Sequence, residues 1–164
     1  MNQRPRYADR ASTQTLREGL EEYYALNPHV TSPKTQPSEF AKILLAHDVG
    51  HIIYGCDTGM HDELKLLPLF WWTSECTFQQ FREMRMRNTA AIDVMYDDMI
   101  RERGGLWLYG SILKVLPPLI PELVSLWFKT HDREKRVPFL EFEPLLDRSL
   151  LDIRQEYDLL PLFK

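Results

Sequence analysis

The chain is poor in the features that several protein classes need. It has only two cysteines, Cys56 and Cys76, and they lack a CxxC spacing. This is too few for a disulfide scaffold, so we expect a reducing compartment. Twenty Lys and Arg residues face 24 Asp and Glu residues, which gives a net charge of -4. Such a balance lacks the concentrated basic field of a nucleic-acid surface, and we expect no nucleic-acid partner.

Long uncharged runs are also missing. The most apolar stretch, residues 106–124, contains Lys114, Glu122 and three prolines, so we expect no transmembrane helix. The arginine-rich start has no apolar segment behind it, which argues against a secretory signal. These absences predict a cytoplasmic protein whose membrane contact is at most transient and peripheral, at the inner membrane.

Strand signals are scarce as well. No Asn-Gly or Asp-Gly turn joins alternating runs, and the β-branched residues are scattered. A content of 44% hydrophobic and 27% charged residues is typical of one globular domain at this length. The sequence predicts an all-α, single-domain bundle of six to seven helices over residues 13–164, with a flexible N-terminal segment over residues 1–12.

Helical recurrence of apolar residues and the positions of glycine and proline place the expected helices. Gly55 and Gly59 end the second one, Pro68 is expected to kink the third, and a proline-rich segment separates the fifth from the sixth. The expected ranges are 13–26, 39–54, 63–87, 88–103, 106–116, 122–130 and 143–157.

The second of these helices carries a dense group of ligand-type residues. His47, Asp48 and His51 fall within one arc of about 100° on a helix, and Glu63 follows after two glycine breaks that let the chain reverse. For the histidines alone, the ordinary interpretation is satisfied core side chains. Burying two carboxylates beside them is costly unless they are bound, which favours a metal site. Nitrogen and carboxylate donors suit Zn²⁺, Fe²⁺ or Mn²⁺.

The pattern His47-Asp48-x-x-His51, eleven residues and then Glu63 resembles the metal-ligand motif of the Coq four family of ubiquinone biosynthesis proteins. The ending, residues 142–159, is also similar to that family's ending, and the short length favours a bacterial homologue. The resemblance implies that these four residues are both metal ligands and catalytic residues. It implies zinc as the ion, with iron, manganese or magnesium as alternatives.

The same resemblance implies a helical homodimer that binds a polyprenylated hydroxybenzoate-type precursor, or another prenyl lipid, and supports C1 decarboxylation, including its oxidative form. Such a protein is a metal-dependent carboxy-lyase and contacts other quinone-biosynthesis proteins. A prenyl tail needs an apolar groove, for which Leu67, Phe70, Trp71, Met95 and Met99 are candidates. For any single one of these side chains, ordinary core packing is the more common explanation.

Two other functions fit parts of the pattern. An HD-type metal phosphohydrolase would use the doublet at positions 47 and 48 with His29 and either Asp93 or Asp97, leaving His51 and Glu63 unexplained. A non-catalytic prenyl-lipid-binding scaffold would hold its metal in a closed shell without an open coordination position. The phosphohydrolase predicts that His29 and an aspartate of residues 93–98 lie next to the doublet. The motif of the Coq four family predicts His51 and Glu63 there instead.

Overall fold

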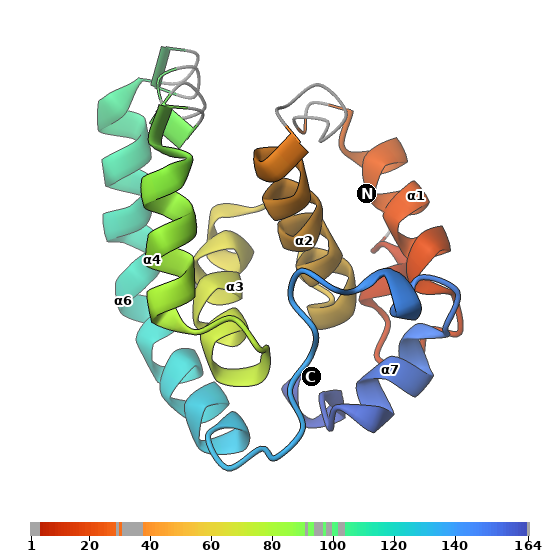
Figure 1. Cartoon of the computed structure of the whole chain (residues 1–164). Coiled ribbons are helices and arrows are strands. Elements are labelled where there is room, and N and C mark those ends of the chain that lie inside the picture. Colours follow the sequence, from red (N-terminus) through yellow and green to blue (C-terminus); the bar gives the residue numbers. More distant parts are fainter. Residues whose placement is uncertain are drawn as a thin grey trace.

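The computed structural model describes residues 4–28, 30, 38–90, 92–93, 97, 100–101 and 104–163, and these fold as one helical assembly (Figure 1). Among them, β-pairing is limited to two isolated bridges, Thr15 with Ser149 and Ser74 with Val137. The predicted all-α fold is therefore confirmed. The α-helices are α1 (Leu16–Leu26), α2 (Ser38–Tyr54), α3 (Met60–Thr73), α4 (Phe78–Arg87), α6 (Gly105–Thr130) and α7 (Leu150–Glu156).

Helix α2 lies at the centre, and small residues let its neighbours approach it closely (Figure 1). A Cβ atom on Gly19 of α1 would lie 2.6 Å from the Ile52 side chain, and one on Gly50 would lie 2.1 Å from the Phe70 ring of α3. Real Cβ atoms do not approach other atoms so closely, so only glycine fits at either position. These two contacts set how near α1 and α3 lie to the helix that carries the motif.

The C-terminal end of α2 is fixed by a glycine turn and a buried arginine. Gly55 has φ +65, and the amide of Cys56 donates to the His51 carbonyl at 2.8 Å, which closes the helix with a left-handed cap. Arg154 of α7 is fully buried and donates to the carbonyls of Ile52 and Ile53. Carbonyls in the last turn of α2 thus accept hydrogen bonds from a side chain about 100 residues away in the sequence.

The N-terminal segment packs on this same corner. Its η1 turn, Arg6–Ala8, buries Tyr7 completely, and Arg154 also donates to the carbonyls of Tyr7 and Asp9. The Glu22 carboxylate of α1 accepts hydrogen bonds from the amides of Arg6 and Tyr7. Of residues 1–12, which were expected to be a flexible segment, the structure describes residues 4–12, and in these Tyr7, Ala8 and Ser12 are buried.

Two predicted helix boundaries are wrong. The expected helix over 63–87 ends at Thr73, and α4 begins afresh because the Thr77 side chain caps the amide of Gln80, whose side chain accepts from the Thr77 amide. Pro68 lies inside α3 without ending it. The expected helix over 143–157 is a 3-10 turn, η3 (Glu143–Leu145), followed by α7, which is capped by Ser149. Much of the expected helix over 88–103 lies outside the described residues.

The largest departure is α6, one continuous helix where two short ones were predicted. Pro117, Pro118 and Pro121 lie inside it on exposed positions, while the buried side chains of Leu119 and Leu126 hold its inner face against α3. Packing against α3 therefore keeps α6 helical at the three prolines, which would end an isolated helix. By length and composition alone, α6 is apolar enough to cross a membrane, with a hydropathy of 1.4 in its most apolar window, of which 11% is buried.

Candidate metal centre

The site is built by two helices that meet at the buried end of α2. His47 and His51 lie one turn apart, with ring centroids separated by 4.7 Å. Glu63, in the first turn of α3, reaches between them: Oε2 lies 3.4 Å from His47 Nε2, and Oε1 lies 3.3 Å from His51 Nε2. One ligand atom from each residue lies within 4.8 Å of the others. The structure therefore brings together three of the four predicted ligands, a group that could hold a metal ion.

Asp48 lies beside this group. Its side chain is buried, Oδ2 accepts a hydrogen bond from the Tyr24 hydroxyl at 2.7 Å, and Oδ1 lies 3.6 Å from His47 Nδ1. With its proton on Nδ1, facing this carboxylate, His47 would have Nε2 free to bind a metal ion. Carboxylates in this position behind a histidine orient many metal ligands. Asp48 thus supports His47 from behind and does not complete the ligand group.

His51 shows an unmet need for a partner. It is fully buried, its ring stacks on Tyr23 at 5.3 Å, and neither ring nitrogen has a hydrogen-bond partner. The contact from Nε2 to Glu63 is near enough for an ion pair but lacks hydrogen-bond geometry. A buried polar nitrogen without a partner costs about 1–3 kcal/mol. A metal ion bound at Nε2 would satisfy it, so the donor set fits such an ion.

The charges of the site depend on one another. Burial opposes protonation of His47, but the carboxylates of Asp48 and Glu63 outweigh it and raise the pKa of His47 to about 9. Burial likewise opposes ionisation of Glu63, but the two histidines lower its pKa to about 2. Without a metal, the group is therefore held by a proton on an imidazole next to an ionised carboxylate. A metal ion must displace this proton to bind.

The group is closed on one side and open on the other. His51 is fully buried, whereas the side chains of His47 and Glu63 are 34% and 36% exposed. Two histidines and one carboxylate are a donor set that zinc enzymes use together with an open coordination position. A substrate oxygen could approach from the exposed side.

Of the remaining histidines and acids, none that the structure describes belongs to the group. His61 is 48% exposed and pairs with Asp62 at 3.1 Å and with Glu122 at 3.4 Å. Asp93 and Asp97 are exposed, and His29 lies outside the described residues. Among the residues that the structure describes, His51 and Glu63 therefore lie next to the His47-Asp48 doublet. The phosphohydrolase interpretation leaves this pair unexplained.

The three described prenyl-groove candidates, Leu67, Phe70 and Trp71, do not line either of two hollows in the described part of the chain. Phe70 is buried against His47, Tyr54 and Phe139. Trp71 contacts Phe78 and Phe81 edge to face, and Leu67 is half-buried. Met95 and Met99 lie outside the described residues. For the three described candidates, core packing explains the surroundings better than a shared groove does.

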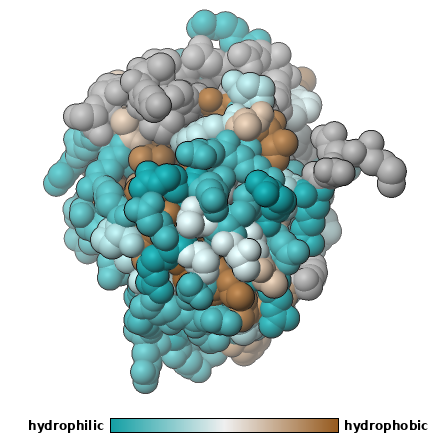
Figure 2. All heavy atoms as spheres, turned by 90° about the vertical axis from the view of Figure 1, so that its right-hand side faces the viewer, coloured by the Kyte–Doolittle hydropathy of each residue, from teal (hydrophilic) through white to brown (hydrophobic). Residues whose placement is uncertain are grey.

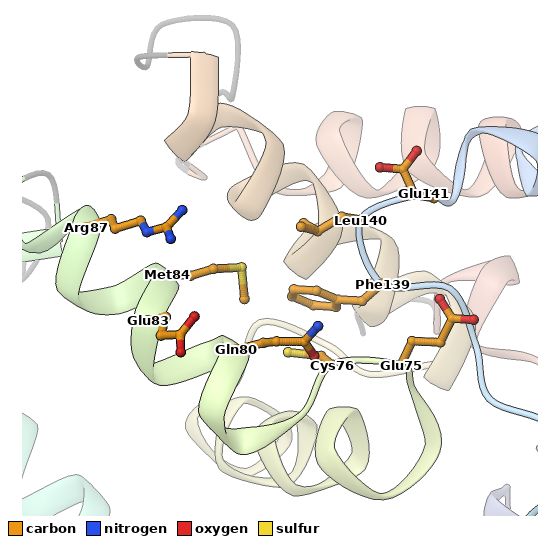
Figure 3. A pocket seen from close by; sticks show the side chains of 9 residues that line it. All are labelled: Glu75, Cys76, Gln80, Glu83, Met84, Arg87, Phe139, Leu140 and Glu141. Atoms are coloured by element: carbon orange, nitrogen blue, oxygen red, sulfur yellow. The ribbon is translucent and has the colours of Figure 1, made fainter.

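A hollow of about 350 Å³ lies elsewhere, between α4 and the connector before α7. Figure 3 shows Met84 of α4 pointing toward Phe139 of this connector, with charged side chains around them. Phe139 contacts Phe70 at 5.1 Å between ring centroids, and Phe70 contacts His47 at 6.4 Å. The hollow is thus separated from the metal group by two aromatic rings. Its lining residues are Glu75, Cys76, Gln80, Glu83, Met84, Arg87, Phe139, Leu140 and Glu141.

Sequence reasoning missed the residues that support the site. Tyr23 and Tyr24 of α1 were not predicted as site residues, yet they contact His51 and Asp48. Burial, together with the hydrogen bond to Asp48, raises the pKa of Tyr24, so it stays a neutral donor. Gly50 occupies a variable position of the motif and Arg154 lies far from it in sequence, and only the packing reveals what each contributes.

Comparison of the chain with protein-family models, with curated proteins and with solved structures finds no match. The resemblance to the Coq four family therefore rests on the motif and on the similar ending. The geometry of the three ligands is an independent observation, because it depends on the packing of α2 against α3 and not on any relative.

Proposed function

We propose that the chain is a metal-dependent enzyme of prenylquinone biosynthesis that removes the C1 carboxyl from a polyprenylated hydroxybenzoate-type precursor. The observation that carries this proposal is the convergence of His47, His51 and Glu63 on one point, with the ring nitrogens of buried His51 lacking hydrogen-bond partners. The substrate class comes from the resemblance of the motif to the Coq four family. Zinc is the ion that this donor set suits best.

Each side chain of the centre has a separate role in this proposal. His47, His51 and Glu63 would hold the ion, which when bound supplies a Lewis acid toward a carboxylate or phenolic oxygen. Asp48 keeps the proton on the far nitrogen of His47, and the Tyr24 hydroxyl fixes Asp48. In simple decarboxylation the bond from the ring to the carboxyl carbon breaks, carbon dioxide leaves and a proton takes its place. The oxidative form adds a hydroxyl and needs an external oxidant such as dioxygen.

The hollow beside Phe139 is the proposed place for the start of the prenyl tail. Met84, Phe139 and Leu140 give it an apolar floor, and a volume of about 350 Å³ is within the range of ligand pockets. Contact through Phe70 joins this floor to His47. A prenyl tail in the hollow has to connect to a ring at the metal group. Phe70 or Phe139 would have to change rotamer, because both aromatic rings lie between the hollow and the metal group.

The exposed side of the centre favours an enzyme over a scaffold. A structural metal is usually enclosed by four protein ligands, whereas here Asp48 stands apart and two of the three ligands are about one third exposed. The scaffold alternative predicts lipid binding without turnover, which the following assay distinguishes.

The test is release of labelled carbon dioxide from a carboxyl-labelled, short-prenyl 4-hydroxybenzoate. The full chain is loaded in turn with Zn²⁺, Fe²⁺ or Mn²⁺, with and without dioxygen. We expect release with at least one ion, a loss of about 100-fold or more in Glu63→Gln, and no change in His61→Ala, a histidine outside the centre. Absence of release with every ion, while the prenyl compound binds, would contradict the enzyme and support the scaffold.

A further inference from the structure

A second hollow, of about 340 Å³, lies where residues 4–8 meet the η4 turn, Leu160–Leu162. Its wall also includes the turn after α2, the first two turns of α3 and one residue of α6. The flank formed by α1 and α7 shows mainly hydrophilic atoms with small separated apolar patches (Figure 2). In the hollow, by contrast, charged and apolar side chains from five segments line one concave space, which is the usual form of a small-molecule site.

Contacts outside the hollow hold its wall in place. The Arg154 guanidinium lies over the Phe163 ring, with 4.3 Å from Cζ to the ring centroid. A Cβ atom on Gly55 would lie 2.5 Å from this ring, so the glycine leaves room for it. Lys129 of α6 donates to the Pro161 carbonyl at 3.0 Å, which ties η4 to α6. A hollow with a fixed wall suits a ligand, because little order has to be gained on binding.

Tyr7 gives the hollow a buried hydroxyl without a partner. Its side chain is fully buried and lines the hollow, and its hydroxyl oxygen has no hydrogen-bond partner among the described residues. Burial raises the pKa of Tyr7, and Asp57, which also lines the hollow, adds the largest electrostatic contribution. The hydroxyl is therefore neutral and lies toward the hollow. An unpaired buried hydroxyl costs about 1–3 kcal/mol, so an occupant that pairs with it is favoured.

Asp62 and Lys65 of the wall satisfy each other. The Asp62 carboxylate pairs with the Lys65 ammonium at 2.9 Å, accepts a hydrogen bond from the Asp57 amide at 2.8 Å and contacts His61 Nδ1 at 3.1 Å. These two charges cancel, so a ligand of the hollow gains little from either of them.

The remaining carboxylates of the wall outnumber its remaining cations. Asp57 and Glu122 stand against Arg4, which is exposed and donates to the Ala8 carbonyl at 2.8 Å. The wall therefore favours a cationic ligand. A metal ion is not that ligand, because among the described residues the acids of the hollow do not bring three ligand atoms together as the metal centre does.

We propose that this hollow binds a small organic amine, whose ammonium group pairs with Asp57 and Glu122 and donates to the Tyr7 hydroxyl oxygen. An ammonium group has three donors, which match these three acceptors. Leu162 and Phe163 give the carbon body of the amine an apolar wall.

The hollow is distinct from the metal centre, although both use α3. Asp62 lines the hollow, whereas Glu63, the next residue, reaches the two histidines of α2. None of the three metal ligands lines the hollow. The inference therefore stands without the proposed function.

The first test is isothermal titration of the full chain with three probes of one shape, 2-phenylethylamine, 2-phenylethanol and 3-phenylpropanoate. At pH 7 we expect the amine to bind with a dissociation constant below about 1 mM, and about 10-fold or more tightly than the alcohol or the acid. Equal affinities for the amine and the alcohol, tighter binding of the acid, or no heat from the amine up to about 10 mM would overturn the proposal.

A primary amine can also coordinate a metal ion, so the titration is repeated on His47→Ala. We expect the same affinity for 2-phenylethylamine as in the parent. Loss of binding in this variant would assign the amine to the metal centre and overturn the proposal for the hollow.

Three conservative variants locate the amine. Tyr7→Phe, Asp57→Asn and Glu122→Gln should each weaken the binding of 2-phenylethylamine by about 10-fold. The control is Glu21→Gln, which removes an exposed carboxylate of α1 that does not line the hollow and should bind as the parent does. Binding as in the parent by all three wall variants would overturn the assignment.

Tyr7→Phe also separates a binding role from a structural one. Because the hydroxyl has no partner within the protein, its removal should leave the Tm of the amine-free chain unchanged or raise it. Added 2-phenylethylamine should raise the Tm of the parent more than that of the variant. A structural hydroxyl would instead make the amine-free variant less stable, and this result would contradict the proposal.

Discussion

The C-terminal end of α2 and the outer face of α6 are similarly apolar, yet one is enclosed and the other is exposed. Ile52 and Ile53 of α2 are at most 1% exposed, whereas Leu106 and Leu113 of α6 are 93% and 72% exposed. The difference comes from the neighbours. Around α2, two glycines and a buried arginine bring three segments into contact. Apolar composition alone therefore does not tell where the core of this protein lies.

Removal of the buried arginine is expected to have the largest effect on the enclosed end of α2. Arg154→Met removes a side-chain donor from four carbonyls, those of Tyr7, Asp9, Ile52 and Ile53, and we expect a loss of about 3–5 kcal/mol in the free energy of unfolding. Burial lowers the pKa of Arg154 to about 10, so it is charged at neutral pH. Urea unfolding monitored by circular dichroism measures the effect.

A matched arginine controls for the loss of charge. Arg148 of the same region pairs with Glu156 at a partly exposed position, so Arg148→Met should cost no more than about 1 kcal/mol. Equal losses in the two variants would show that the carbonyl contacts of Arg154 contribute nothing special to the enclosed corner.

Substitution of one glycine in α2 and one in α6 tests the difference in packing between the two helices. Gly50→Ala forces a methyl group into the Phe70 ring and should destabilise the chain by about 1–3 kcal/mol. It should also weaken zinc binding, because α3 carries Glu63. Gly110→Ala on α6 meets nothing within 4 Å and should stabilise the helix by up to about 1 kcal/mol. Thermal unfolding and zinc titration measure both variants, and a destabilising Gly110→Ala would contradict the exposed surroundings of α6.

Tyr24 of α1 supports the metal centre through its hydrogen bond to Asp48, and we expect a smaller effect when this hydrogen bond is removed. Tyr24→Phe removes the hydrogen bond to Asp48 but keeps the ring, so zinc affinity should fall about 10-fold with little change in fold. Isothermal titration in two buffers gives the affinity and the proton release together. Tyr109→Phe, an exposed tyrosine of α6, is the control. An unchanged affinity in Tyr24→Phe would remove Asp48 from the support of His47.

The smallest effect concerns the N-terminal segment and depends on pH. Partial burial opposes ionisation of Glu22, but hydrogen bonds from Arg6, Gln14 and Tyr7 lower its pKa below 4.5. Its stabilising contribution is therefore full above pH 4.5 and is lost as the pH falls through the lowered pKa. Glu22→Gln should lose about 1 kcal/mol at pH 7 and show a weaker acid dependence. Glu21→Gln, on the exposed neighbour, should behave as the parent, and identical acid profiles for all three proteins would disprove the role of Glu22.

The fold class and the shared face of His47 and His51 could be predicted from the sequence because both depend on local patterns, whereas Glu63 is brought to them by the packing of α2 against α3. Helical recurrence locates α2, and His47 and His51 must share a face once that helix forms. The role of Asp48 was not predictable, because it is decided by Tyr24 on another helix. The course of α6 was predicted wrongly, since proline rules describe an isolated helix and not one that is held by α3.

Metal content of the purified chain and its variants tests the central claim most directly. We expect one ion per chain in the parent and in His61→Ala, and none in His47→Ala, His51→Ala or Glu63→Ala. Asp48→Asn should keep the ion with an affinity lowered about 10–100-fold. Stoichiometric metal in Glu63→Ala would contradict the three-ligand centre, and so would a complete loss in Asp48→Asn that equals the loss in the ligand variants.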